Sequence, residues 1–206
     1  MDADDALSFG PLPRRTVHLC VDMQRLFAED TPWRTPWVEG ILPRVEELAS
    51  ARAAQTVFTR FVPPHSPVDA HGAWRRYYEH WEEMTTRRLD TDLLELLPPL
   101  AALVPPARVV DKRTYSPFAD GTLAAWMQGQ GVEALVISGA ETDVCVLATV
   151  LSAVDLGFRI IVAEDAICGS ADETHDSLVR FYHTRLSEQV EIAPVEAILK
   201  GWNVDG

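Results

Sequence analysis

The stretch EALVISGAETDVCVLATVLSAVDLGFRIIVA, residues 133–163, decides the fold. It opens with a short apolar run, residues 133–138, that predicts a buried strand. Residues 142–156 then predict a helix that ends at Gly157, a residue that commonly terminates helices. A second apolar run at residues 158–163 predicts another strand. Strand, helix and strand in this order indicate two parallel strands joined by a helical crossover.

The same alternation extends in both directions along the chain. Further strand-like runs occupy residues 16–22, 55–60, 108–112 and 189–192, and helical patterns occupy residues 38–53, 72–84, 90–97, 121–130 and 172–185. Nearly continuous apolar strands indicate a parallel sheet covered on both faces. We therefore predict an α/β protein, a three-layer α/β/α Rossmann-like fold with a six-stranded parallel sheet. It consists of an N-terminal arm, residues 1–15, and a single domain, residues 16–206.

The composition excludes several classes of function. The chain has 206 residues, of which 47% are hydrophobic, so it can bury a sizeable core. Its 18 basic and 31 acidic residues give a net charge of −13, which disfavours nucleic acid and anionic membrane surfaces as partners. The 3 cysteines are too few for a disulfide framework, and the acidic first residues lack the apolar core of a secretory signal. We expect a cytoplasmic protein.

Three reactive side chains stand at predicted strand ends. Asp22 ends the first strand, Lys112 ends the third, and Cys145 lies in the first turn of the helix after the fourth. Ligands of open parallel sheets bind at this edge. A helix N-terminus and an ammonium both favour a thiolate, so Cys145 is expected to titrate below a free cysteine, with Asp22 as general base. The alternative is that the carboxylate and amine are solvated and the thiol is part of the core.

Three motifs resemble the isochorismatase-like cysteine hydrolases, the group that includes nicotinamidases and N-carbamoylsarcosine amidases. They are VDMQ at residues 21–24, KRTYSPF at residues 112–118 and GAETDVC at residues 139–145. The resemblance implies that Asp22 is the catalytic general base and acid, that Lys112 stabilises the thiolate, and that Cys145 is the nucleophile. It also implies a cis peptide between Ala140 and Glu141. That bond would aim the N–H groups of Glu141 and Cys145 at an oxyanion.

The metal site of nicotinamidases has no counterpart in the matching stretch. Phe61 and Pro63 stand where the resemblance would place the metal-binding Asp and His. His65, Asp69 and His71 follow in a proline-rich loop, without a carboxylate anchored on a strand. We therefore expect no metal and no cofactor, and the presence of a cysteine favours cleavage of an amide-like C–N bond.

The expected substrate pocket is aromatic. Phe27, Trp33, Tyr115 and Phe118 flank the three motifs, and Trp81 and Thr142 complete the predicted pocket. The segment at residues 74–81 places aromatic side chains at helical spacing. That pattern is typical of a helix packed on the sheet or of a subunit interface, and the alternative is a pocket wall or lid over the nucleophile.

The combined prediction is a metal-independent cysteine hydrolase that cleaves an amide, carbamoyl or lactam C–N bond of a small molecule through a thioester. Two alternatives stay open: a nicotinamidase-like or ether-cleaving hydrolase, and an inactive binding or assembly module. The predicted helix over residues 147–156 is apolar nearly all round, which suits burial in a homo-oligomer.

Overall fold

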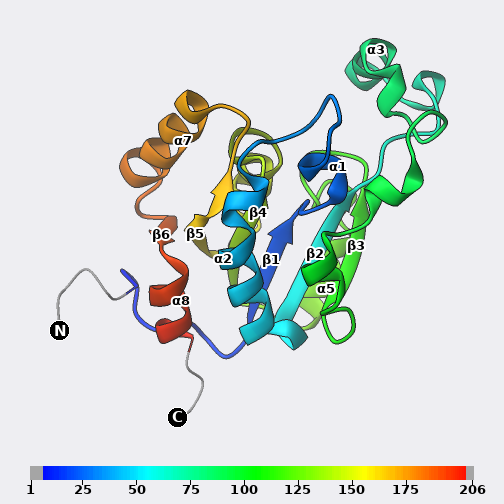
Figure 1. The fold of residues 1–206 in the computed structure, drawn as a ribbon. Helices are drawn as coiled ribbons and strands as arrows, with labels where there is room; N and C mark the ends of the chain where they lie inside the picture. Colours follow the sequence, from blue (N-terminus) through cyan, green and yellow to red (C-terminus); the bar gives the residue numbers. More distant parts are fainter. Residues whose placement is uncertain (1–6, 203–206) are drawn as a thin grey trace.

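Six parallel strands form one sheet in the order β3-β2-β1-β4-β5-β6 (Figure 1). The structure is a computed structural model that describes residues 7–202. The strands are β1 (Thr16–Val21), β2 (Thr56–Phe61), β3 (Arg108–Lys112), β4 (Ala134–Ala140), β5 (Arg159–Cys168) and β6 (Val190–Ala193). The predicted six-stranded parallel sheet is confirmed. β1 pairs with β2 on one side and β4 on the other, so the direction of winding reverses between β1 and β4.

Helices cover both faces of the sheet (Figure 1). One face packs against α2 (Val38–Ala51) and α8 (Val195–Gly201), and the other against α5 (Thr122–Gly129), α6 (Leu147–Asp155) and α7 (Asp172–Arg185). Side chains alternate along each strand, so Cys20 joins the α2 core while Leu19 and Val21 join the α6 core. The three-layer arrangement is therefore confirmed. Within α6, Val150 and Ala153 are buried, and a subunit interface on this helix stays a prediction.

Some helices differ from the sequence prediction. The stretch predicted as one helix at residues 72–84 forms the shorter helix α3 (Ala73–His80) and the 3-10 turn η4 (Glu82–Met84). The stretch that follows forms the 3-10 turn η5 (Thr91–Leu94) and the short helix α4 (Pro98–Ala101). The helix predicted at residues 90–97 is wrong because Leu97 precedes a proline and is extended, with ψ 138°. The helix predicted at residues 142–156 begins as a π-helical turn, η6 (Thr142–Val146). The sequence analysis missed α1 (Arg25–Ala28) and α8. The 3-10 turns η2 (Ala53–Gln55) and η3 (Pro67–Asp69) complete the elements.

The described part of the N-terminal arm, residues 7–15, lies against the domain. Leu7 and Leu12 are buried, and the Leu12 N–H donates to the carbonyl of Gly201 at 2.8 Å. The Arg159 guanidinium donates to the carbonyls of Gly10 and Pro11. Residues 1–6 lie outside the described residues. From Leu7 onward the arm is therefore packed.

A buried imidazole joins the three central strands. His18 on β1 has no exposed surface, and its ring nitrogens lie 3.1 Å from Thr56 Oγ1 and 2.7 Å from Ser138 Oγ. Burial lowers the pKa of His18 from 6.5 to about 3, so the ring is neutral in the folded protein.

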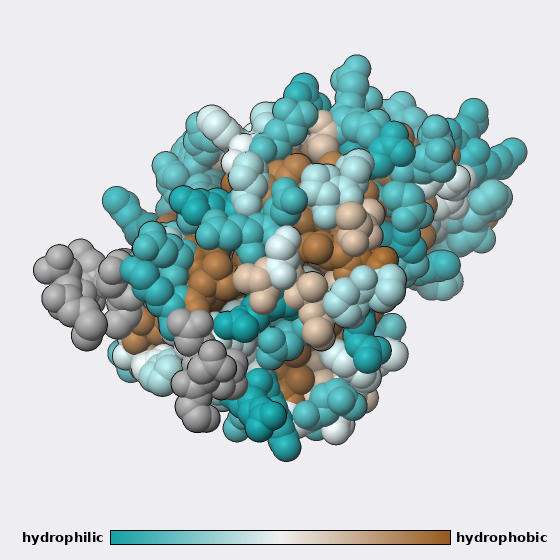
Figure 2. Space-filling model, turned by 60° about the horizontal axis from the view of Figure 1, so that its bottom comes forward, coloured by the Kyte–Doolittle hydropathy of each residue, from teal (hydrophilic) through white to brown (hydrophobic). Residues whose placement is uncertain are grey.

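The surface is mixed in character. Figure 2 turns the lower end of Figure 1 toward the viewer, where hydrophobic residues lie in small groups between hydrophilic ones. Among the helices of residues 7–202, none combines the length and the apolar character that a membrane span needs.

Candidate active site

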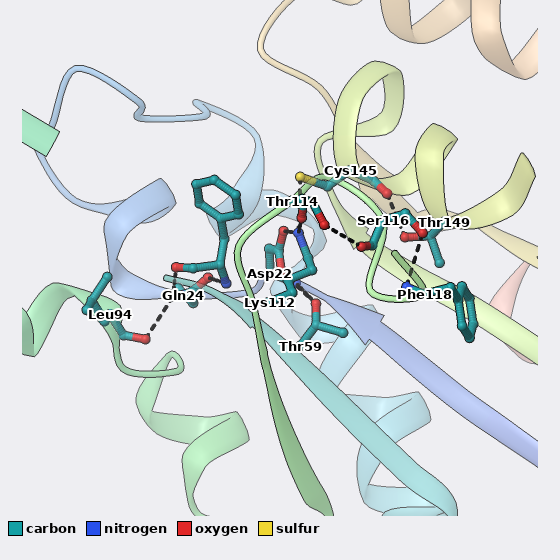
Figure 3. A network of polar contacts seen from close by, with 11 residues as sticks. Asp22, Gln24, Thr59, Leu94, Lys112, Thr114, Ser116, Phe118, Cys145 and Thr149 are labelled. Atoms are coloured by element: carbon teal, nitrogen blue, oxygen red, sulfur yellow. Dashed lines mark hydrogen bonds and ion pairs between the residues drawn. The ribbon is translucent and has the colours of Figure 1, made fainter. Parts of the chain in front are cut away.

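Asp22 lies just beyond β1, where the winding of the sheet reverses. Its backbone has φ 51°, an uncommon conformation for a residue other than glycine and a costly one, at about 1–3 kcal/mol. The side chain has no exposed surface. The Thr59 hydroxyl donates to Asp22 Oδ1 at 2.6 Å and accepts from the Asp22 N–H at 3.1 Å (Figure 3). Thr59 on β2 therefore fixes the orientation of the carboxylate.

Lys112 is the last residue of β3, two strands away from β1. Its side chain reaches over the Phe61 ring, with Nζ 4.9 Å from the ring centroid, and ends 2.6 Å from Asp22 Oδ2. The ammonium also donates to the Thr114 carbonyl at 3.0 Å and to Cys145 Sγ at 3.5 Å (Figure 3). Burial opposes its charge, but the Asp22 carboxylate and the neighbouring Cys145 outweigh burial and raise the pKa of Lys112. The ammonium is therefore charged at neutral pH.

Cys145 completes the group from η6, the turn that follows β4. Its side chain is buried, with 6% of the residue exposed, and its carbonyl accepts the Thr149 hydroxyl at 2.6 Å. Burial raises the pKa of the Cys145 thiol, the Asp22 carboxylate raises it further, and Lys112 only partly opposes them. The expectation that Cys145 titrates below a free cysteine is therefore wrong for this structure. Burial and the Asp22 carboxylate both favour the protonated thiol.

The turn between β4 and Cys145 packs tightly against β1. Gly139 has φ 109°, and a Cβ atom there would lie 2.0 Å from the carbonyl oxygen of Val21, the residue before Asp22. Only glycine fits this position. The peptide bond between Ala140 and Glu141 is cis. The oxyanion hole expected from the Glu141 and Cys145 N–H groups stays a prediction.

An aromatic cavity of about 340 Å³ opens at Cys145. Five rings line it, those of Phe27, Trp33, Phe61, Tyr77 and Tyr115. Glu141, Ser170 and Arg34 add polar groups to its wall. The thiol therefore faces a space that would hold a small molecule.

Comparison with known proteins identifies the family. The model of the isochorismatase domain matches residues 16–193. This chain belongs to the isochorismatase family. A relative similar in sequence is the maleamate amidohydrolase of Pseudomonas putida, 27% identical over 83% of this chain and 79% of that protein.

Solved structures of the same fold include a cysteine hydrolase and an amidase. A cysteine hydrolase from Pseudomonas syringae pv. phaseolicola has a TM-score of 0.82 at 22% identity, covering 97% of this chain and 98% of that one. N-carbamoylsarcosine amidase from Thermoplasma acidophilum has a TM-score of 0.70 at 21% identity, covering 93% and 99%. The predicted resemblance is confirmed, and the chain is an isochorismatase-family hydrolase.

Three of the six residues predicted for the substrate pocket line this cavity. Phe27, Trp33 and Tyr115 line the cavity. Trp81 lies behind its wall, packed edge-on against Trp33 with ring centroids 6.5 Å apart. Phe118 is instead in the opposite core, beside Phe158, because its N–H is held by the Ser116 hydroxyl in a tight turn.

Thr142 is the third residue that was predicted to line the pocket but lies elsewhere. It is fully buried, and its hydroxyl lies 2.9 Å from Nδ1 of His175 on α7. Its position in the first turn of η6 directs it toward α7 rather than toward the cavity. Thr142 therefore belongs to the packing between η6 and α7.

Several residues of the site escaped the sequence analysis. Thr59 contacts Asp22 only because β1 and β2 are in register, and nothing in the sequence near Asp22 signals it. Tyr77 comes from the aromatic segment on α3, so the pocket-wall alternative applies to this one ring. The side chain of Glu141 was not predicted to face the cavity, although the residue was singled out for its N–H. Its neighbour Ser170 follows β5 in a turn that had no assigned role.

Phe61 and Pro63, the residues that stand where a metal-binding Asp and His were considered, are packed among other side chains. The Phe61 ring lies under Lys112 and 5.9 Å from the Trp33 ring, and Pro63 is buried. Asp69 accepts hydrogen bonds from the backbone and hydroxyl of Ser66. Within residues 7–202 no group of three or more His, Cys, Asp or Glu side chains is arranged to hold a metal ion.

Proposed function

We propose that this chain is a cysteine amidohydrolase that cleaves the C–N bond of a small amide, carbamoyl compound or lactam through a thioester, without a metal. One observation carries the proposal: a buried ammonium contacts both a buried carboxylate and a buried thiol, and the thiol lines an aromatic cavity. The similarity to a maleamate amidohydrolase supports C–N rather than ether cleavage.

Acylation follows from the protonation states in the resting site. The Cys145 thiol gives its proton to the Asp22 carboxylate as the sulfur attacks the carbonyl carbon of the substrate. Lys112, 3.5 Å from the sulfur, stabilises the thiolate as it forms. In this proposal the backbone N–H groups of Glu141 and Cys145 hold the oxyanion. The C–N bond then breaks, and ammonia or an amine leaves with the proton from Asp22.

Deacylation reverses these roles. A water molecule gives a proton to Asp22 while its oxygen attacks the thioester carbon. The C–S bond breaks, the carboxylic acid product leaves, and Asp22 returns the proton to the Cys145 sulfur. Thr59 keeps the carboxylate in place through both steps, because its hydroxyl bonds to the oxygen of Asp22 that does not contact Lys112.

Trapping the acyl-enzyme tests this proposal. The purified protein is mixed with a panel of small amides and carbamoyl compounds, quenched in acid and analysed by mass spectrometry. A turned-over substrate should leave its acyl mass on the peptide that contains Cys145, with stoichiometric release of ammonia or amine.

Two variants sharpen this test. Cys145→Ala should abolish turnover, whereas Cys20→Ser, a change to a thiol buried in the α2 core, is the matched control that should retain it. Full turnover by Cys145→Ala would refute the thioester route. Turnover of a vinyl ether but of no amide would favour the ether-cleaving alternative.

A further inference from the structure

The cavity combines aromatic faces with a carboxylate. Trp33 lies at the centre of its wall, stacked on Phe27 with ring centroids 6.5 Å apart and packed against Phe61 and Tyr77 at 5.9 and 5.8 Å. The faces of such rings carry negative electrostatic potential and attract cations. The Lys112 ammonium over Phe61 shows that attraction within the site itself.

Glu141 adds an acidic side chain to the same wall. The Thr35 hydroxyl donates to Glu141 Oε1 at 2.9 Å, and Ser170 also hydrogen-bonds to the carboxylate. Burial raises the pKa of Glu141, while these two hydroxyls favour its charged form. Both hydroxyls are neutral, so they orient the carboxylate and leave its charge in place.

The charge of Glu141 is not balanced by a neighbouring cation. None of the ion pairs formed within residues 7–202 involves Glu141. Lys112 is engaged by Asp22 at 2.6 Å. Arg34 also lines the cavity, but it is exposed, so water and salt screen its charge far more than that of the partly buried Glu141. The partly buried wall of the cavity is therefore negative.

From this arrangement we propose that the cavity selects amides that carry a positive charge close to the reactive carbonyl, such as a quaternary ammonium or a protonated amine. The ring faces of Trp33, Phe27 and Tyr77 would surround the cation, and Glu141 would neutralise it. This proposal rests on the proposed amidohydrolase function and names its substrate class. The side chain of Glu141 thereby acts in specificity.

Two amides of the same shape test the charge alone. Trimethylammonioacetamide and 3,3-dimethylbutanamide differ only in a cationic nitrogen that replaces a carbon. We expect the wild-type protein to prefer the cation by at least about tenfold in kcat/KM, the scale of a cation held among aromatic faces. Succinamate supplies the anionic comparison. Equal rates on the matched pair would overturn the proposal. A preference for succinamate would also overturn it, because the Arg34 guanidinium would then be the group that selects the substrate.

A charge-removing variant assigns the preference to Glu141. In Glu141→Gln the amide oxygen can still accept from Thr35, and we expect the ratio of kcat/KM between the two amides to fall toward one. Glu133→Gln removes the same charge from an exposed position just before β4, and its ratio should match the wild type. A ratio unchanged in Glu141→Gln would overturn the assignment. The wild-type ratio tests the charge preference even where Glu141→Gln does not fold.

Binding measurements separate this inference from the proposed reaction. Calorimetry with Cys145→Ala should show tighter binding of trimethylammonioacetamide than of 3,3-dimethylbutanamide. Cation-selective binding without hydrolysis of any amide or carbamoyl compound in the panel would refute the amidase proposal and leave the cation site standing. Hydrolysis of both amides, with neither rate nor binding depending on charge, would refute the cation site and leave the amidase standing.

Discussion

The ion pair between Asp22 and Lys112 gives the sharpest test of the site. Both groups are buried, at 0% and 6% exposure, and their charged atoms lie 2.6 Å apart. Removing one partner leaves the other as an uncompensated buried charge, which typically costs about 3–5 kcal/mol. Asp22→Asn and Lys112→Met should each lose that much stability. Removing both charges together should cost less than either single change, because no buried charge is left without its partner.

Urea denaturation of the four proteins, wild type, two single variants and the double variant, measures this coupling. Asn at position 22 can still accept the Thr59 hydroxyl, and Met at position 112 keeps much of the lysine stem volume. We expect an interaction free energy of several kcal/mol, well outside the few tenths that independent sites show. A double variant that loses the sum of the two single losses would refute the view that these charges hold each other in place.

The three remaining predictions concern metal, thiol and acid stability. Amidase activity should survive dialysis against a strong chelator, and a bound metal whose removal abolishes turnover would contradict our interpretation of Phe61 and Pro63. Because burial raises the pKa of Cys145, its alkylation by iodoacetamide should be slow at neutral pH and keep accelerating about tenfold per pH unit beyond about pH 9, where the rate of an ordinary thiol levels off; a rate, followed by mass spectrometry, that levels off at or below about pH 9 would refute this. His18 stays neutral in the folded protein down to about pH 3, whereas the unfolded chain binds a proton below its unperturbed pKa of 6.5. The free energy of unfolding should therefore decrease as the pH is lowered, by about 2 kcal/mol between about pH 7.5 and pH 5. If urea melts of His18→Gln show the same loss, the assignment of this pH dependence to His18 is refuted.

Local patterns predicted the sheet because each strand is a short apolar run. They also predicted that three reactive side chains meet at one edge, because Asp22, Lys112 and Cys145 stand at or just beyond strand ends that a parallel sheet brings together. These patterns do not predict the register, which is the alignment of residues between paired strands. The contact of Thr59 with Asp22 depends on the alignment of β1 with β2, which the run of residues in either strand does not specify.

The cavity wall and the state of the thiol depend on packing across the whole domain. Tyr77 reaches the cavity because its ring packs against Trp33, whereas Phe118 turns into the opposite core although it stands closer to Lys112 in sequence. The sequence analysis weighed the helix terminus and Lys112 in favour of a thiolate at Cys145. It had no measure of burial, which favours the neutral thiol and prevails.

Lys112 comes from the strand at the edge of the sheet. β3 pairs with β2 alone, and all four of its residues before Lys112 are at least partly exposed to water. Edge elements with exposed backbone open more readily than a central strand, at a free energy below that of global unfolding. Each such opening would withdraw the ammonium from Asp22 and Cys145 while β1 and β4 stay folded. The lifetime of the assembled site is then set by the local dynamics of its most peripheral strand, so catalysis and hydrogen exchange at β3 would report the same fluctuation.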